Sequence, residues 1–184
     1  MRIIVGKLKG STIEAPRGVL SRPPLAIIRE SVFNILADSV EGMRVLDLFA
    51  GSGSLGIEAL SRGAGQAHFV DSSGRSVDMI ERNIKKLGVS DDCRVSRLDS
   101  MDFVRSWKGE PFDIVFVDPP FLSGLVDDVL AGLTASPVLS PGAIVVLRTH
   151  WRENPVIPEA LAEMKRRKFG ESVVRFLRSD GGAL

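Results

Sequence analysis

The stretch Asp47-Leu48-Phe49-Ala50-Gly51-Ser52-Gly53-Ser54-Leu55-Gly56 decides the fold class of this chain. An apolar run, residues 44–49, leads into it, and the helix-forming segment 55–62 follows and is closed by Gly63. The glycines fit the pattern Gly-x-Gly-x-x-Gly, which joins a strand to a helix in open α/β sheets and brings the backbone close to a ligand. The stretch therefore predicts a βα unit with a ligand site at the end of its strand.

Further βα units follow along the chain, because short apolar runs alternate with segments of helical periodicity. Strands are predicted at 66–71, 94–98, 112–117, 143–147 and 173–177. One helix is predicted from the helical spacing of the apolar residues Val77, Ile80, Ile84 and Leu87, and Gly88 ends it. Further helices are predicted at 99–107, 125–133 and 158–165. A tight turn at 169–172 predicts a terminal hairpin, and hence one antiparallel strand in a mainly parallel, seven-stranded sheet.

Residues 1–40 differ from this repeating pattern. They contain two short predicted strands, 2–5 and 11–15, and a linker with Pro and Gly at 16–24. A helix follows, whose predicted core face is Ile28, Val32, Ile35 or Leu36, and Ser39. We therefore expect an N-terminal extension, residues 1–40, made of a hairpin and a helix and packed on a core domain, residues 41–184.

The composition excludes several classes of protein. Of the 184 residues, 44% are apolar and 26% are charged, which suits one folded domain rather than a disordered or collagen-like chain. The single cysteine, Cys93, and the two histidines, His68 and His150, predict neither a disulfide framework nor a metal site. No apolar run reaches the ~18 residues of a membrane span. We expect a metal-free cytoplasmic protein with no membrane partner.

The net charge of +1 conceals an uneven distribution. Residues 1–30 carry a net charge of +4, residues 31–147 carry −6, and residues 148–178 carry +4. Basic ends around an acidic middle predict that an anionic partner contacts the two ends of the chain, although solvated surface charge explains the same pattern.

Two aspartates at the ends of predicted strands indicate the ligand. Asp71 follows Gly51 by twenty residues, where a carboxylate accepts hydrogen bonds from the ribose of a nicotinamide cofactor or of S-adenosylmethionine. Asp47 separates these cofactors, because a neighbouring anion disfavours a pyrophosphate but stabilises the ammonium and sulfonium of S-adenosylmethionine. The predicted cofactor is therefore S-adenosylmethionine. A helix-capping or turn role is the alternative for Asp47.

Other residues at the same edge complete the predicted cofactor site. Asp99 and Ser100 can bond the adenine amine, although Asp99 also suits a helix N-cap. A Cβ at Gly51 or Gly53 is expected to block the ligand, with simple turn geometry as the alternative for Gly53. The predicted cofactor-binding residues are Asp47, Phe49, Gly51, Ser52, Gly53, Asp71, Ser72, Asp99 and Ser100.

The fourth predicted strand ends in Asp118-Pro119-Pro120-Phe121, the predicted catalytic residues. The two prolines remove two N–H donors and fix both φ angles, which leaves a rigid rim with one carboxylate and one free carbonyl. Such a rim can accept both hydrogens of a planar amine, and Phe121 offers a ring on which an aromatic acceptor stacks. We expect the rim to orient an exocyclic amine for methylation, with Asp118 able to take the proton.

These motifs resemble those of the bacterial 16S rRNA guanine-N2 methyltransferases of the RsmD type. The resemblance covers nearly the whole chain and rests on 47–56, 118–121, Arg2-Ile3-Ile4 with Gly6 and Gly10, Arg22-Pro23, and Arg29-Glu30-Ser31-Val32-Phe33-Asn34-Ile35-Leu36. It implies the Rossmann-like class I fold of S-adenosylmethionine-dependent methyltransferases. It also implies methyl transfer to N2 of one guanine in 16S rRNA, presented in a partly assembled small subunit and turned out of its stack.

We expect a monomer whose basic ends contact the RNA. The predicted RNA-binding residues are Lys7, Lys9, Arg22, Arg29, Arg166 and Arg167. The chain departs from the family at Pro24, Leu25, Ala26 and Ile27, where polar residues are usual, and we interpret this as a divergent substrate contact. It also has Arg148 where relatives often have Glu, a change that we expect to leave the core chemistry unaffected.

Three other functions fit parts of the sequence. A nicotinamide dehydrogenase fits the glycine motif and Asp71 but not Asp47. A methyltransferase acting on adenine N6 in DNA or on a glutamine side chain fits the cofactor site, although such enzymes more often begin the rim motif with Asn than with Asp118. A non-enzymatic RNA-binding assembly factor is disfavoured by the intact residues at 47, 51, 53, 71 and 118.

Overall fold

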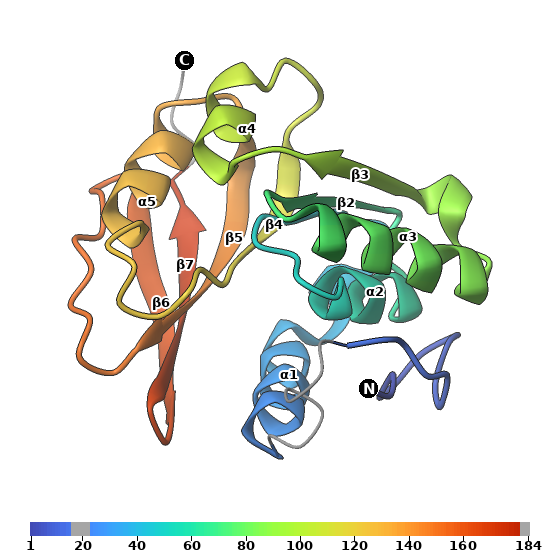
Figure 1. Cartoon of the computed structure of the whole chain (residues 1–184). Helices are drawn as coiled ribbons and strands as arrows, with labels where there is room; N and C mark the ends of the chain where they lie inside the picture. Colours follow the sequence, from blue (N-terminus) through green and yellow to red (C-terminus); the bar gives the residue numbers. More distant parts are fainter. Residues whose placement is uncertain (16–22, 181–184) are drawn as a thin grey trace.

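The computed structural model describes residues 1–15 and 23–180, and its centre is one seven-stranded sheet (Figure 1). Along the sheet the strands follow the order β3-β2-β1-β4-β5-β7-β6. Strands β1 to β5 are parallel, while β7 is antiparallel to both β5 and β6. The strands are β1 Arg44–Asp47, β2 Gln66–Asp71, β3 Cys93–Arg97, β4 Phe112–Val117, β5 Leu139–His150, β6 Leu161–Phe169 and β7 Ser172–Ser179. The predicted seven-stranded sheet with one antiparallel strand is confirmed.

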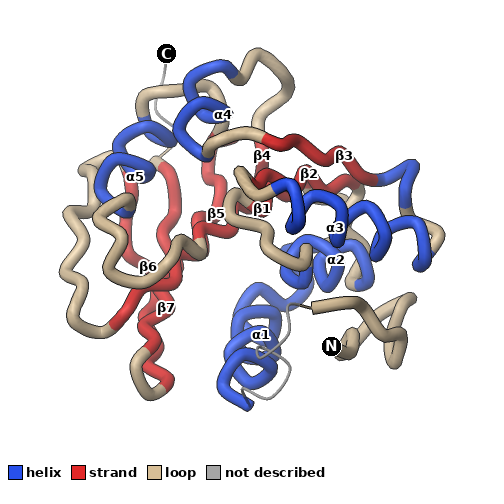
Figure 2. The backbone as a smooth tube through the Cα atoms, viewed as in Figure 1, coloured by secondary structure: helices blue, strands red, loops and turns tan. Residues whose placement is uncertain are grey.

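Helices cover both faces of the sheet (Figure 2). They are α1 Pro23–Leu36, α2 Ser54–Ser61, α3 Gly74–Leu87, α4 Ser100–Ser106 and α5 Val126–Thr134, with short 3-10 helices at Ala37–Val40 and Ser90–Asp92. Helices α1, α2 and α3 pack on one face and α4 and α5 on the other. No helix among residues 1–15 and 23–180 combines the length and apolar character needed to cross a membrane.

The sheet separates two apolar clusters because neighbouring residues of a strand point to opposite faces. In β1, Val45 belongs to the cluster under α1, α2 and α3, and Leu46 to the cluster under α4 and α5. In β4, Phe116 and Val117 divide in the same way. The near-continuous apolar run at 112–117 is thus a central strand buried on both faces, as its composition predicts.

The helix predicted at 158–165 is wrong. Residues 161–169 form strand β6, which pairs with β7 from Leu161 opposite Ser179 to Phe169 opposite Ser172. The segment is rich in Glu, Lys and Arg, which are common in helices. Here they lie on an edge strand, where exposed charges are tolerated and discourage pairing with another chain. The backbone pairing with β7 overrides the local propensity.

Strand β5 is longer than predicted. It begins at Leu139, ahead of the strand predicted at 143–147, and its register with β4 shifts between the pairs Phe112–Leu139 and Ile114–Ile144. Gly142 adopts a φ of 76° at this irregularity, a conformation that favours glycine. The strand then continues to His150 at the carboxyl edge of the sheet.

The two strands predicted at the N-terminus reduce to a single antiparallel bridge between Arg2 and Thr12. Backbone bonds on either side of it extend the pairing, with the N–H of Ile3 donating to Ser11 over 2.9 Å and that of Ile13 donating to Met1 over 2.8 Å. In α1 the buried face consists of Ile28, Val32, Phe33 and Leu36. Ser39, expected on that face, lies exposed beyond the end of the helix.

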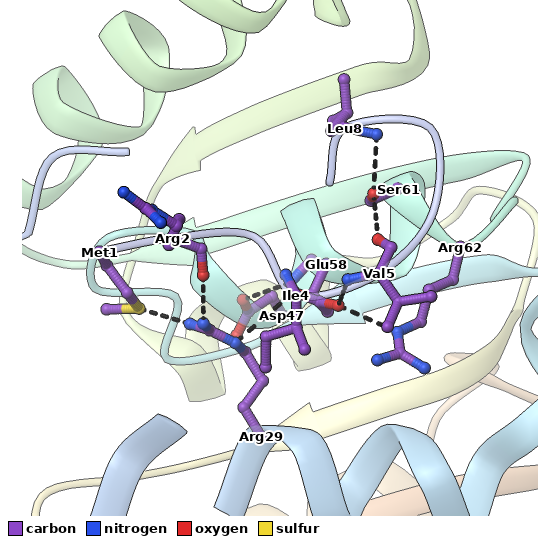
Figure 3. A network of polar contacts seen from close by, with 11 residues as sticks. Met1, Arg2, Ile4, Val5, Leu8, Arg29, Asp47, Glu58, Ser61 and Arg62 are labelled. Atoms are coloured by element: carbon purple, nitrogen blue, oxygen red, sulfur yellow. Dashed lines mark hydrogen bonds and ion pairs between the residues drawn. The ribbon is translucent and has the colours of Figure 1, made fainter. Parts of the chain in front are cut away.

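Glu58 of α2 holds the N-terminal segment against this helix (Figure 3). Its fully buried carboxylate accepts the N–H groups of Ile4 and Val5 over 2.9 and 3.1 Å. The same carboxylate lies 3.6 Å from Nε of Arg29 and 3.0 Å from Nε of Arg62. One side chain therefore joins the first residues of the chain, helix α1 and the end of α2.

Candidate active site

The candidate residues meet at the carboxyl edge of the sheet beside β1. Strand β1 lies between β2 and β4. On one side of β1 the sheet continues through β2 to β3, and on the other side it continues through β4 to β5. Open α/β sheets bind ligands in the crevice at such a switch point. Two adjoining cavities open there and share Phe49, Asp118 and Arg148.

We name the cavities after one lining residue each. The Asp47 cavity is lined by two carboxyl groups, two arginines, part of the glycine loop with the start of α2, and an apolar wall: Asp47, Asp118, Arg29, Arg148, Phe49, Ala50, Gly51, Ser52, Ser54, Leu55, Met1, Ile28, Val32, Val146 and Val174. The Phe121 cavity is lined by Phe49, Asp71, Ser72, Asp99, Ser100, Asp118, Pro119, Pro120, Phe121 and Arg148. Of the thirteen residues predicted to bind the cofactor or to act in catalysis, all except Gly53 line these two cavities.

Asp47 is a buried carboxyl with few donors. It is 2% exposed, and its Oδ2 accepts the N–H of Gly56 over 3.1 Å in the first turn of α2. Burial raises the pKa of Asp47 to about 7; the Gly56 bond lowers it, while Asp118 and Asp71 raise it further. The helix-capping alternative describes part of its role. Because burial disfavours the charged form of this carboxyl, a cation that enters the cavity would stabilise its ionised form.

Asp71 fixes the glycine loop in addition to facing the Phe121 cavity. Its Oδ2 accepts the N–H of Gly51 and its Oδ1 accepts the N–H of Ser73, both over 2.8 Å. The carboxylate thus joins the loop after β1 to the loop after β2. Each oxygen keeps a further lone pair with which it can accept from a ligand hydroxyl.

The glycines of the motif serve different purposes. A Cβ at Gly51 would meet open space, but its φ of 57° is a left-handed conformation that favours glycine. At Gly56 a Cβ would lie 2.3 Å from the ring of Phe69. At Gly53 it would meet Phe69, Ile57 and Ile80 at 3.3 to 3.4 Å, so it would point into the core. The expected clash of a Gly53 side chain with the ligand is therefore wrong, and turn geometry with core packing explains this glycine.

Asp99 is the N-cap of α4, as its alternative interpretation predicts. Its Oδ1 accepts the N–H of Met101 over 2.8 Å, and the side chain is exposed beside the Phe121 cavity. Ser100 is 5% exposed and Ser72 is exposed, both on the same cavity wall. Ser52 is buried, and its carbonyl accepts from Nδ2 of Asn83 over 3.0 Å, which ties the glycine loop to α3.

The rim 118–121 follows β4 directly, and Arg148 of β5 reaches it. The Nε of Arg148 donates to Oδ1 of Asp118 over 2.6 Å, and its guanidinium carbon lies 4.9 Å from the ring centre of Phe121. Burial raises the pKa of Asp118, and the Arg148 charge and hydrogen bond oppose that rise. Arg148 thus contacts two of the predicted catalytic residues, and the expectation that its presence leaves the core chemistry unaffected stays a prediction.

Five of the six predicted RNA-binding residues fall into three groups. Lys7 and Lys9 are exposed in the N-terminal segment, and Lys7 lies 3.7 Å from Asp92. Arg166 and Arg167 are exposed on edge strand β6 rather than at a helix end. Arg22 lies outside the described residues.

Arg29 is not a surface residue, so its predicted contact with RNA is wrong. It is 4% exposed, lies 3.6 Å from Glu58, and donates to Sδ of Met1 and to the carbonyl of Arg2 (Figure 3). Burial lowers the pKa of Arg29, and Glu58 opposes that shift. Its charge is used to anchor the N-terminal segment. Ala26 and Ile27, two of the departures from the family, are exposed on α1, and Ile27 is 56% exposed.

The sequence did not identify the apolar wall of the Asp47 cavity. That wall consists of Met1, Ile28, Val32, Val146 and Val174. The spacing of Ile28 and Val32 marks a buried helix face but does not say which element the helix covers. Val146 and Val174 reach the cavity through the antiparallel pairing of β5 and β7, and Met1 carries no local signal.

Comparison with known proteins places the chain in a family. Residues 1–178 match the family model described as "Conserved hypothetical protein 95". The chain belongs to this family. Its relative from Escherichia coli (strain K12), named ribosomal RNA small subunit methyltransferase D, is 31% identical over 98% of this chain and 90% of the relative.

Solved structures confirm the fold. The structure of yhhF from Escherichia coli has a TM-score of 0.89 and 31% sequence identity, and the match covers 99% of both chains. An RNA methyltransferase from Salinibacter ruber, solved with S-adenosyl-L-homocysteine, has a TM-score of 0.67 at 15% identity over 94% of this chain and 97% of that one, which shows the fold alone. The family member described here thus has the Rossmann-like fold of S-adenosylmethionine-dependent methyltransferases, as predicted.

Proposed function

We propose that this protein transfers a methyl group from S-adenosylmethionine to the N2 amine of one guanine in 16S rRNA. The observation that carries the proposal is the position of Asp118. Its carboxylate lies at the junction of the two cavities, beside the ring of Phe121 and at the edge of the cavity that contains Asp47. Family membership and the relatives named as ribosomal RNA small subunit methyltransferases support RNA as the acceptor.

The residues of the two cavities fit the proposed donor. S-adenosylmethionine, when bound, supplies a methyl group on a positively charged sulfur. The buried carboxyl of Asp47 would hold its ammonium, and Asp71 would accept from the ribose hydroxyls. Ser100 and Asp99 line the part of the Phe121 cavity suited to the adenine. The open space on the Cα of Gly51 lets the donor approach the loop closely.

The rim residues would present the acceptor. Phe121, which is 37% exposed, offers its ring for stacking of a base turned out of the RNA. Asp118 would accept a hydrogen bond from the amine and hold its nitrogen in line with the methyl group. S-adenosylmethionine would supply the methyl group and leave as a neutral thioether, and Asp118 or water would take the proton that the nitrogen loses as it gains the methyl group. Orientation and stabilisation of positive charge would account for most of the catalysis.

The basic ends of the chain would contact the RNA. The turn between β6 and β7 lies beside the end of β5, because Ser172 pairs with His150, and this places Arg166 and Arg167 on the strand that leads to the active-site edge. Lys7 and Lys9 belong to the proposed extension, residues 1–40. The proposed partner is a partly assembled small ribosomal subunit in the cytoplasm, and a monomer suffices to bind it.

The Asp118→Ala variant tests the reaction. We expect it to lose methyl transfer to small-subunit RNA while it binds S-adenosylhomocysteine with nearly unchanged affinity, because Asp47 and Asp71 remain. Asp78→Ala, which removes an exposed carboxyl of α3, is the matched control and should keep full activity. Transfer that survives the loss of Asp118 would show that this carboxylate does not have the proposed role.

The cofactor and the target are tested separately. In a thermal-shift comparison we expect S-adenosylhomocysteine to raise the melting temperature and NAD to leave it unchanged. Mapping of methylated bases in 16S rRNA from a strain that lacks the gene should show one unmodified guanine N2. If the strain instead lacks the methyl group on an adenine, or on a glutamine in a protein, that residue is the acceptor and the proposed guanine is not.

A further inference from the structure

Arg148 occupies the place in which the proposed function puts the acceptor base. In the parallel pairing of β4 and β5, Val117 lies opposite Leu147. The residues that follow them, Asp118 and Arg148, therefore lie side by side at the edge of the sheet. The Arg148 side chain is 21% exposed and lines both cavities. It therefore borders both the proposed donor site and the proposed acceptor site.

Its two contacts are those that an acceptor base would make. The Nε–H of Arg148 donates to Oδ1 of Asp118 over 2.6 Å, and its guanidinium stacks over the ring of Phe121 at 4.9 Å. A carboxylate that accepts from an N–H group and an aromatic ring that stacks on the planar group are the two recognition elements of the rim. In the structure both are taken by one arginine.

The position of Phe121 in this arrangement is held by the backbone. Glu153 accepts the N–H of Leu122 over 3.1 Å with one carboxylate oxygen and the N–H of His150 over 2.6 Å with the other. The residue after Phe121 is thus tied to the end of β5, two residues beyond Arg148. These backbone bonds hold Phe121 beside Arg148, and the Arg148 side chain is the group that would have to move for another planar group to stack there.

The chemistry of the two planar groups is closely alike. A guanidinium carries N–H donors on nitrogens that share one carbon, and the Watson–Crick edge of guanine presents the N1–H and the N2 amine on one carbon in the same way. The corresponding edge of adenine places an acceptor nitrogen next to its amine, which a carboxylate would repel. Among the bases, guanine is therefore the one whose edge an arginine imitates.

We propose that Arg148 is an internal surrogate for the guanine edge, which fills the acceptor pocket in the free protein and must swing out before the base enters. This proposal rests on the function proposed above and adds a gate and a basis for selecting guanine. A pocket that is occupied for most of the time lowers the apparent affinity for its ligand in proportion to the fraction of time it is free. Removal of Arg148 should therefore strengthen base binding.

Equilibrium binding of mononucleotides tests the proposal without requiring activity. Guanosine monophosphate and adenosine monophosphate are titrated into the wild-type protein and into Arg148→Ala, each saturated with S-adenosylhomocysteine. We expect Arg148→Ala to bind guanosine monophosphate about tenfold more tightly than the wild type, and adenosine monophosphate with little change. Arg152→Ala is the matched control, because it removes a neighbouring arginine that stacks over Trp151 instead.

A second variant and a small probe separate gating from positioning. Arg148→Lys keeps the positive charge beside Asp118 but loses the planar group, and it should also bind guanosine monophosphate more tightly than the wild type. Methylguanidinium chloride should compete with the nucleotide in Arg148→Ala, whereas tetramethylammonium chloride at equal ionic strength should not. If Arg148 instead positions Asp118, methylguanidinium will strengthen nucleotide binding or restore lost transfer, and the surrogate proposal is overturned.

The outcomes also distinguish this proposal from the function on which it rests. Unchanged or weaker guanosine monophosphate binding in both Arg148 variants, with wild-type transfer to RNA intact, rejects the surrogate alone. Tighter binding of guanosine monophosphate in both variants, with no wild-type transfer to any small-subunit RNA, rejects the reaction while the guanine-like pocket stands.

Discussion

Asp47 and Glu58 are both buried carboxyl groups near helix α2, yet the protein holds them in different ways. Glu58 is fully buried and receives two backbone N–H groups and two arginine side chains. Asp47 is 2% exposed and accepts the N–H of Gly56. Asp47 also lines a cavity, the one named after it above.

Glu58 has the contacts of a carboxylate that stabilises the fold, whereas Asp47 has those of a carboxylate suited to bind a ligand. Burial of a charge is costly, and in Glu58 charged partners and N–H donors offset that cost within the chain. In Asp47 the cost is only partly offset, which is why its pKa rises to about 7. A cation in the Asp47 cavity would supply the missing charge. We therefore expect the removal of Glu58 to affect folding and the removal of Asp47 to affect ligand binding.

The largest effect is expected for Glu58→Gln. Loss of one partner from a buried ion pair leaves Arg29 without its counter-charge, and we expect the free energy of unfolding to fall by about 3–5 kcal/mol. Urea denaturation measures this change. Glu14→Gln is the matched control, because Glu14 pairs with Arg82 on the surface, where both side chains are about half exposed, and its loss should cost less than about 1 kcal/mol. Equal losses in the two variants would remove the distinction.

Asp47→Asn should have the next largest effect, on ligand affinity. The asparagine can still accept the N–H of Gly56, but it cannot balance an ammonium. We expect the affinity for S-adenosylhomocysteine to fall by about 10- to 100-fold, in line with the ~1.5–3 kcal/mol of a charged hydrogen bond. Isothermal titration calorimetry measures it. An unchanged affinity would show that the cation binds elsewhere.

The pH dependence of binding follows from the raised pKa of Asp47. Below about pH 7 the carboxyl is protonated in the free protein, whereas a bound cation favours the ionised form. The affinity for S-adenosylhomocysteine should therefore fall as the pH is lowered from 7 to 5.5, by up to about tenfold per unit. The same titration of Asp47→Asn should be much flatter. Parallel pH profiles for the two proteins would assign the titration to another group.

The smallest effect is expected on the stability of the free protein. Because the folded pKa of Asp47 lies above its unfolded value of about 4, the folded state binds more protons between pH 4 and 7, and its stability falls as the pH rises through that range. Asp47→Asn removes this penalty. We expect the melting temperature of Asp47→Asn at pH 8, without ligand, to exceed that of the wild type by at least about 2–4 °C. Calorimetry measures this difference. A decrease would mean that the charge of Asp47 stabilises the fold.

Much of the fold follows from local pattern. Residues 66–71 and 112–117 are strands with the predicted bounds, and the near-continuous apolar run of 112–117 is typical of a strand buried on both faces. Helix α3 ends at Gly88, whose φ of 69° shows the left-handed cap that the sequence indicates. The glycine loop follows β1 because the motif itself requires a strand before it and a helix after it.

The elements that local pattern missed depend on distant partners. Strand β6 carries charges because it lies at the edge of the sheet, and only its pairing with β7 makes it a strand. Arg29 lies in a basic segment, but Glu58 of another helix meets it in the interior. Charge along the chain does not reveal which charges are buried.

The class of fold and the glycine loop follow from the amino-acid sequence alone, since each is a short pattern that one backbone geometry satisfies, and the same kind of pattern predicts the rim at 118–121. Tertiary structure decided what these residues face. The pairing of β4 with β5 brings Arg148 to Asp118 across 30 residues, and the packing of α1 and β7 closes the Asp47 cavity. Such contacts arise from burial of the whole core, so no segment of the sequence contains them alone.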